Sequence, residues 1–219
     1  AGTGAVIAAG LIKIIAFILI SPALGFLFGS LLMVAVGWLF FRTAPSRVDK
    51  YFRRLQLVSA ALYSLGHGGN DAKKPARIIW MLLIAATLAN PQVMPHWMQA
   101  HPDHLPGWIV MVCYVTIGFG TMFGGWRIVK TMGQKITKLK PVGGFCAETG
   151  GAMTLFLATS MGIPVSTTHT ITGAIVGVGS TNRLSAVRWG VAGGIVWAWV
   201  LTIPASALIA AIAWWVGTL

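Results

Sequence analysis

Long apolar runs dominate this sequence and limit the folds open to it. They cover residues 5–41, 78–89, 108–126 and 189–216, and several approach or exceed the roughly 20 residues that a helix needs to cross a bilayer. Of the 219 residues, 56% are hydrophobic and 9% are charged, which is too little polar surface to cover a soluble domain. The sequence therefore predicts an all-α protein, a polytopic transmembrane helical bundle that forms a single membrane domain over residues 1–219.

Basic residues predict how these helices are oriented. The formal net charge is +12, and most lysines and arginines fall into two clusters: Arg42, Arg47, Lys50, Arg53 and Arg54, and Arg127, Lys130, Lys135, Lys138 and Lys140. Because positively charged loops stay on the cytoplasmic side of a membrane, we expect both clusters in cytoplasmic loops. The same rule accounts for the positive charge without a nucleic-acid partner.

Histidines and cysteines give no metal site in this interpretation. Residues 90–107 lack lysine and arginine and contain prolines with His96, His101 and His104. The irregular histidine spacing and the prolines favour a solvated outward loop over a metal site. Cys113 and Cys146 are far apart and form no C-x-x-C pair, so we expect small core residues and no disulfide.

Prolines and glycines predict where the apolar runs are interrupted. Pro22 predicts that the first run divides into two helices, with Ser21 as the cap of the second. Residues 143–181 are too short for two comfortable spans and contain a Gly162–Pro164 break, so we expect two half-helices, roughly 144–160 and 165–180, that meet at the break. Two thin full spans remain the alternative.

Glycines four residues apart predict close helix packing, because a missing side chain lets two backbones approach each other. Such pairs are Gly25 with Gly29, Gly120 with Gly124, Gly173 with Gly177, and Gly190 with Gly194.

Acidic residues are rare, and two of them stand out. Asp49 and Asp103 belong to expected loops, whereas Asp71 follows a glycine-rich stretch and Glu148 lies inside the expected hairpin. An ionisable group at membrane depth is costly, so it indicates a functional site.

The stretch "SLGHGGNDAKKP", residues 64–75, predicts a break in the helix. The glycines would let main-chain carbonyls turn toward Asn70 and Asp71, whose oxygens suit a dehydrated alkali cation. The alternative is an ordinary ion pair between Asp71 and a nearby basic side chain, namely Lys73, Lys74 or Arg77.

The stretch "GIPVSTTHT", residues 162–170, predicts an anion site. Pro164 suits the first turn of a helix, so the hydroxyls of Ser166, Thr167 and Thr168 would gather with free N–H groups at the positive helix end. Such an end binds phosphate-like anions. Simple capping by one hydroxyl is the alternative, and His169 either donates to the anion, relays a proton or packs in the core.

Other classes of function fit less well. An intramembrane hydrolase that used Ser166, His169 and Asp71 would need a nucleophile setting that the sequence lacks, and no P-loop is present. We therefore expect no enzyme. An anion channel or a structural subunit of a membrane complex remains the alternative to a transporter.

Two stretches carry a resemblance to a known family. "GHGGNDAKK" and "PVSTTHTITGAIVGVG" resemble the signature motifs of the inorganic phosphate transporter (Pit) family, and residues 10–29 and 143–154 resemble the segments that accompany them. The resemblance implies a low-affinity secondary transporter of the bacterial inner membrane. It would move phosphate, in bacteria often as a neutral metal–phosphate complex, by symport with sodium or protons and without a cofactor.

That family is built from two inverted repeats, each with both motifs, whereas this chain has one of each. The resemblance thus implies one half of a transporter, N-terminally truncated, with connecting helices and a cytoplasmic loop in residues 1–54 and the C-terminal repeat in 55–219. A missing N-terminal repeat or a second copy would complete it. The implied phosphate ligands are Ser166, Thr167, Thr168 and Asn70, and the implied cation or proton-coupling residues are Asp71, Asn70, Glu148 and His169.

Overall fold

Helices make up nearly all of the described chain. The computed structural model describes residues 8–90, 92, 95–100 and 102–217. Its α-helices are α1 (Ala8–Leu39), α2 (Pro45–Ala89), α3 (Gly107–Lys130), α4 (Pro141–Ser160), α5 (Thr167–Asn182) and α6 (Trp189–Gly217), with a short π-helix, η2 (Thr131–Lys135), and a 3₁₀ helix, η3 (Leu184–Ala186). No strand occurs among these residues, which confirms the all-α prediction.

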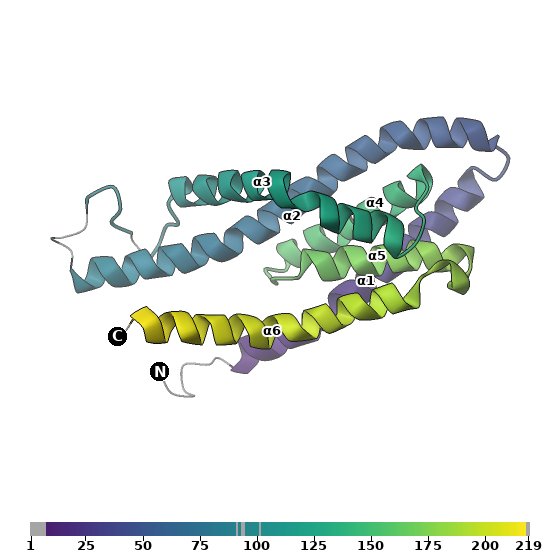
Figure 1. Ribbon diagram of the computed structural model, residues 1–219. Helices are drawn as coiled ribbons and strands as arrows, with labels where there is room; N and C mark the ends of the chain where they lie inside the picture. The colour runs from purple at the N-terminus through teal and green to yellow at the C-terminus, as the bar shows by residue number, and fades with distance from the viewer. Residues whose placement is uncertain (1–7, 91, 93–94, 101, 218–219) are drawn as a thin grey trace.

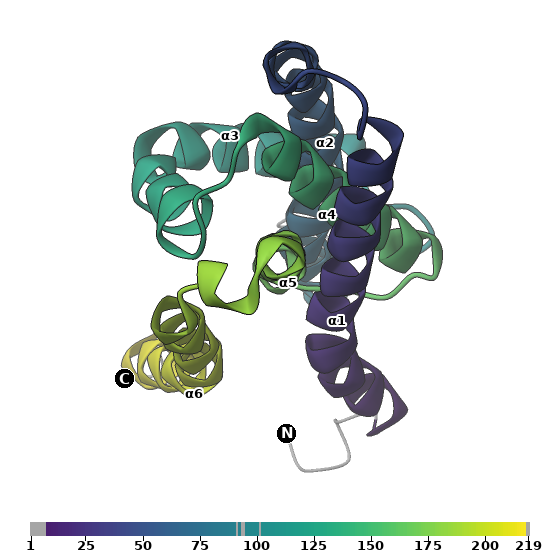
Figure 2. The ribbon, with the colours of Figure 1, turned by 90° about the vertical axis from the view of Figure 1, so that its right-hand side faces the viewer.

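The α4–α5 hairpin lies at the centre of the bundle (Figure 1). Helix α1 packs against both α4 and α5, and α2 packs against α4 and α3. Helix α6 stands to one side (Figure 2), and Ala192 is the one buried residue within its described length. Helices α1, α3 and α6 contain segments long and apolar enough to cross a membrane, and α4 and α5 do not.

Glycines bring the backbones of α1 and α5 into contact. A Cβ atom added to Gly25 would collide with the carbonyl of Thr170, and one added to Gly173 would collide with the carbonyl of Pro22. The close packing predicted for Gly25, Gly29, Gly173 and Gly177 is therefore confirmed. The pairs Gly120 with Gly124 and Gly190 with Gly194 have no neighbouring atom within 4 Å of an added Cβ in the described chain, so the contact expected there is not seen.

The predicted division of the first apolar run is wrong, because α1 is continuous through Pro22. Ser21 caps nothing: it is fully buried, and its hydroxyl has no hydrogen-bond partner among the described residues. Proline removes a helix hydrogen bond, but neighbouring helices often compensate for that loss in membrane proteins. Here the backbone of Pro22 is held against Gly173 of α5.

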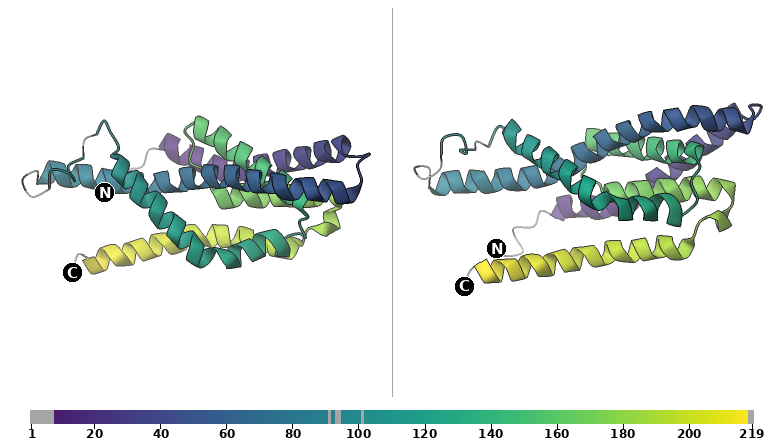
Figure 3. Two further views of the ribbon diagram at one scale, coloured as in Figure 1. Left: turned by 90° about the horizontal axis from the view of Figure 1, so that it is seen from above. Right: turned by 45° about the horizontal axis from the view of Figure 1, so that its top comes forward.

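The break predicted in residues 64–75 is also wrong. Helix α2 continues through this stretch (Figure 3), and its glycines serve packing. Gly66 faces Leu155 of α4, and Gly69 faces the hydroxyl of Tyr114 of α3. Within the described chain, the positive φ angle of 68° at Gly162 is the one left-handed backbone position, so the true interruption lies between α4 and α5.

That interruption agrees with the predicted hairpin, since α4 and α5 closely match the expected half-helices. Their details differ in one respect: Pro164 precedes the helix, and Ser166 is its N-cap. The basic clusters also lie mostly on helix ends, because the connections are only residues 40–44 and 136–140. Cys113 and Cys146 are buried, unpaired and part of the apolar core, as predicted.

Replacing Gly68 by alanine tests whether α2 is helical there. The added methyl would make ordinary contact with Tyr114, 3.9 Å away, so Gly68→Ala should stabilise the protein by about 0.5–1 kcal/mol. Gly162→Ala should instead cost about 1–2 kcal/mol, because only glycine adopts a left-handed conformation readily. Thermal unfolding in detergent, followed by circular dichroism, measures both. Destabilisation by Gly68→Ala would indicate an unwound α2.

Gly25→Ala tests the backbone contact between α1 and α5. It should destabilise the protein by about 1–3 kcal/mol through overpacking. The matched control, Gly37→Ala, lies in the same helix with no described atom within 4 Å of the new methyl and should be neutral or slightly stabilising. Equal unfolding midpoints for the two variants would contradict the interface.

Candidate functional site

One face of α2 carries most of the polar side chains of the site. They recur every three or four residues, the spacing that places side chains on one face of a helix: Gln56, Ser59, Tyr63, His67, Asn70 and Lys74. Several of them bond to α4, to α5 or to the connection between these helices. The spacing was a sequence signal for a continuous helix, and the glycines obscured it.

The connection between α4 and α5 is held by this face. The carbonyl of Val165 accepts hydrogen bonds from Asn70 Nδ2 at 2.8 Å and from Lys74 Nζ at 2.9 Å. Tyr63 Oη donates to the carbonyl of Thr167 at 3.2 Å. Backbone groups of an interrupted helix need such partners in an apolar bundle, so α2 supplies the partners that the helix break removes.

Asp71 links α2 to the start of α5. Its Oδ1 accepts from Lys74 Nζ at 3.0 Å, its Oδ2 accepts from Thr167 Oγ1 at 3.2 Å, and His67 Nε2 lies 3.5 Å from Oδ2. The alternative ion pair of Asp71 is thus present, with Lys74 as the partner. Lys74 touches two hard oxygens, the Asp71 carboxylate and the Val165 carbonyl, of the kind that bind alkali cations.

The hydroxyl residues at the N-terminal end of α5 differ in their surroundings. Ser166 Oγ accepts from the backbone N–H of His169 at 3.4 Å, which is the capping role weighed above. Thr167 is buried and Thr168 is exposed. The backbone N–H groups of Thr167 and Thr168 have no acceptor in the described part of the chain, so the positive helix end keeps free donors.

A small cavity of about 70 Å³ adjoins the connection between α4 and α5. Asn70 and three basic side chains of α2, Lys73, Lys74 and Arg77, line one side of it, and residues of the break line the other. Three cationic side chains at one cavity favour an anion there. The sequence prediction had treated these basic residues only as ion-pair partners of Asp71, although their helical spacing places them beside Asn70.

Glu148 lies apart from Asp71. Its Oε2 accepts from Ser59 Oγ at 2.6 Å, and Gln56 Nε2 lies 3.5 Å from its Oε1. Ser59 precedes Asn70 by about three turns of α2, or about 16 Å at 1.5 Å per residue. Glu148 therefore forms a second polar cluster, between α2 and α4.

His169 contacts α6. Its ring stacks on Trp199 of α6 with centroids 3.8 Å apart, and its Nδ1 is buried without a hydrogen-bond partner in the described chain. The histidine beside Asp71 is His67. Among the described residues, no three histidine, cysteine or acidic side chains gather as metal ligands; His101 of the proline-rich segment lies outside those residues.

Comparisons with known proteins find phosphate transporters. The model of the phosphate transporter family matches residues 1–210. A probable low-affinity inorganic phosphate transporter of Rhizobium meliloti is 54% identical over 218 residues, which cover 100% of this chain and 62% of the relative. One of Bacillus subtilis is 41% identical over 99% of this chain and, again, 62% of the relative.

A solved structure described as the sodium-dependent phosphate transporter has a TM-score of 0.61 and 33% identity; the match covers 72% of this chain and 37% of that chain. This chain thus spans 62% of the length of both curated relatives described above. Those relatives are named as transporters and not as enzymes, in agreement with the expectation from sequence. The chain belongs to the phosphate transporter family.

Proposed function

We propose that this chain forms part of a low-affinity secondary transporter for inorganic phosphate, a cation-coupled symporter of the bacterial inner membrane. Its family and the names of its relatives support phosphate as the substrate. The name of the sodium-dependent structural neighbour supports coupling to a cation. Three helices able to cross a membrane support a multi-pass membrane protein.

One contact carries the proposal: Thr167 Oγ1 donates to Asp71 Oδ2 at 3.2 Å. It joins the residues expected to bind a cation to the residues expected to bind an anion. A phosphate ion and a cation bound at so short a separation attract each other strongly in a medium of low dielectric constant. Each ligand therefore raises the affinity for the other, and that reciprocity is the basis of symport.

Phosphate binds at the N-terminal end of α5 in this proposal. The free N–H groups of Thr167 and Thr168 and the Thr168 hydroxyl face the anion, and Asn70 approaches from α2. Ser166 Oγ, which caps the helix, contributes by keeping those N–H groups aligned. The basic side chains beside the break, Lys73 and Arg77, add positive charge.

The coupling cation takes the position that the Lys74 ammonium holds. Sodium would bind Asp71 Oδ1 and the Val165 carbonyl, both of which now contact Lys74; a proton would instead neutralise Asp71. In either case Lys74 is released from Asp71 and is free to turn toward the phosphate. Glu148, bonded to Ser59, offers a second cation or proton site. His169 stacks on Trp199, so we assign it a packing role ahead of a role in coupling.

The transport unit needs a second set of both motifs, supplied by another repeat or by a second copy of this chain. In this scheme residues 1–54 connect the repeats, residues 55–219 form one of them, and substrate is exposed alternately as the repeats rock about the site. A neutral metal–phosphate complex is a further substrate, because it brings its own cation to the same place.

Radiolabelled phosphate uptake into proteoliposomes tests this proposal, with Asp71→Asn as the variant. We expect uptake to fall at least tenfold, because the substitution removes the charge that holds the cation. Asp49→Asn is the matched control: it lies in the same helix, where Asp49 forms an exposed ion pair with Arg53, and it should leave uptake unchanged.

Sodium and proton gradients, imposed separately, identify the coupling ion. Saturable uptake that follows one gradient supports symport, whereas unsaturated flux indifferent to both would indicate an anion channel. If the protein binds phosphate without transporting it, equilibrium dialysis of the same variants reports on the site itself. Unchanged phosphate affinity in Asp71→Asn, with and without sodium, would overturn the assignment.

A further inference from the structure

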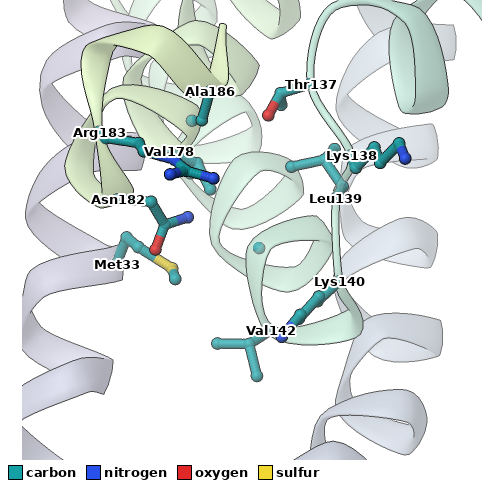
Figure 4. A pocket seen from close by; sticks show the side chains of 12 residues that line it. Met33, Thr137, Lys138, Leu139, Lys140, Val142, Val178, Asn182, Arg183 and Ala186 are labelled. Carbon is teal, nitrogen blue, oxygen red and sulfur yellow. The ribbon is translucent and has the colours of Figure 1, made fainter.

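A second cavity lies at the opposite end of the α4–α5 hairpin from the break. Its volume is about 420 Å³, within the usual range for small-molecule sites. It is bounded by the segment before α4, the first turn of α4 and the last turn of α5, with Met33 of α1 at one side (Figure 4). Nothing in the proposed transport cycle uses this cavity.

The charged groups around the cavity are all cationic. Lys138, Lys140 and Arg183 line it, and no carboxylate does. The ion pairs of the described chain involve other basic residues. Figure 4 shows the Arg183 guanidinium directed into the cavity and Lys138 directed away from it, so Arg183 and Lys140 are the cations that a bound group would meet.

Two further sets of donors point to an anionic ligand. Thr137 is 6% exposed, its hydroxyl is turned toward the cavity in Figure 4, and it makes no hydrogen bond to any described residue. The backbone N–H groups of Val142 and Gly143, at the start of α4, also have no acceptor in the described chain, and no side chain caps this helix. The Thr137 hydroxyl is therefore a donor at the cavity wall that no described residue uses, and a phosphate oxygen could accept from it.

Apart from Asn182, the remaining walls carry no polar side chain. Met33, Leu139, Val142 and Val178 line the cavity, and Met33 belongs to a helix able to cross a membrane. A bare phosphate ion would leave these walls unused, whereas a phosphate ester with an apolar body would cover them. The positive-inside rule predicts that this end of the bundle lies at the cytoplasmic surface, where anionic lipids are found.

We propose that this cavity binds the phosphate group of an ester with an apolar body, the chemistry of an anionic phospholipid headgroup. The phosphate lies at the N-terminal end of α4, because the C-terminal carbonyls of α5 carry partial negative charge. Arg183 contacts it from the α5 side, and Thr137 donates to it from the preceding segment. The bound ester thereby bridges the two outer ends of the hairpin.

Thermal unfolding of the purified protein in detergent tests the site, because a ligand that binds the folded state raises the midpoint. The probes are dioctanoyl phosphatidylglycerol, dioctanoyl phosphatidylcholine and inorganic phosphate, each titrated separately. We expect phosphatidylglycerol to raise the midpoint and phosphatidylcholine to have little effect. Arg183→Gln should weaken the apparent affinity about tenfold, and Thr137→Val, which keeps the shape without the hydroxyl, about fivefold.

Arg54→Gln is the matched control, since it removes the same charge from an exposed position outside the cavity. Inorganic phosphate alone could raise the unfolding midpoint, and Arg183→Gln but not Asp71→Asn could reduce that rise. In that case the natural ligand is free phosphate and not a lipid. Equal effects of the two lipids, or equal effects of Arg183→Gln and Arg54→Gln on every probe, would overturn the proposal. Those results would not affect the transport proposal, because that proposal depends on Asp71.

Discussion

The structure depends on how a helix interrupted inside an apolar bundle keeps its backbone hydrogen-bonded. Between α4 and α5 the carbonyl of Val165 accepts from Asn70 and Lys74 of α2, and at the start of α5 the carbonyl of Thr167 accepts from Tyr63. Without water, each unpaired carbonyl would cost several kcal/mol. The polar face of α2 therefore has a structural role before any ligand binds, and the same residues that stabilise the break also bring charge to it.

Glycine contacts fix where the break lies relative to its surroundings. Because α1 and α5 touch through their backbones near Gly25 and Gly173, α5 has little freedom to shift along α1. Its N-terminal donors thus stay beside Asp71, whose carboxylate bonds to Thr167. The positive end of α5, the Asp71 carboxylate and the Lys74 ammonium therefore lie close together. A change in the charge of one group changes the electrostatic energy of the other two.

Local chemistry determined which features could be predicted from the sequence. The hairpin followed from Gly162 and Pro164, and Ser166 as a possible cap followed from its hydroxyl. The continuity of α2 was also predictable, because its polar residues recur with helical spacing, but glycines were given more weight than periodicity. The partner of Glu148, Ser59, is 89 residues away in the chain, and the contact between His169 and Trp199 depends on how α6 packs. Neither follows from local sequence.

The most direct test of the account is a double-mutant cycle between Asp71 and Thr167, read as phosphate affinity at fixed sodium concentration. The two side chains touch, so their effects should not add. Asp71→Asn and Thr167→Val should each weaken binding, and the second substitution should cost much less once the first is present. Strictly additive losses would show that the α2 face and the α5 helix end act independently, and would contradict a shared site.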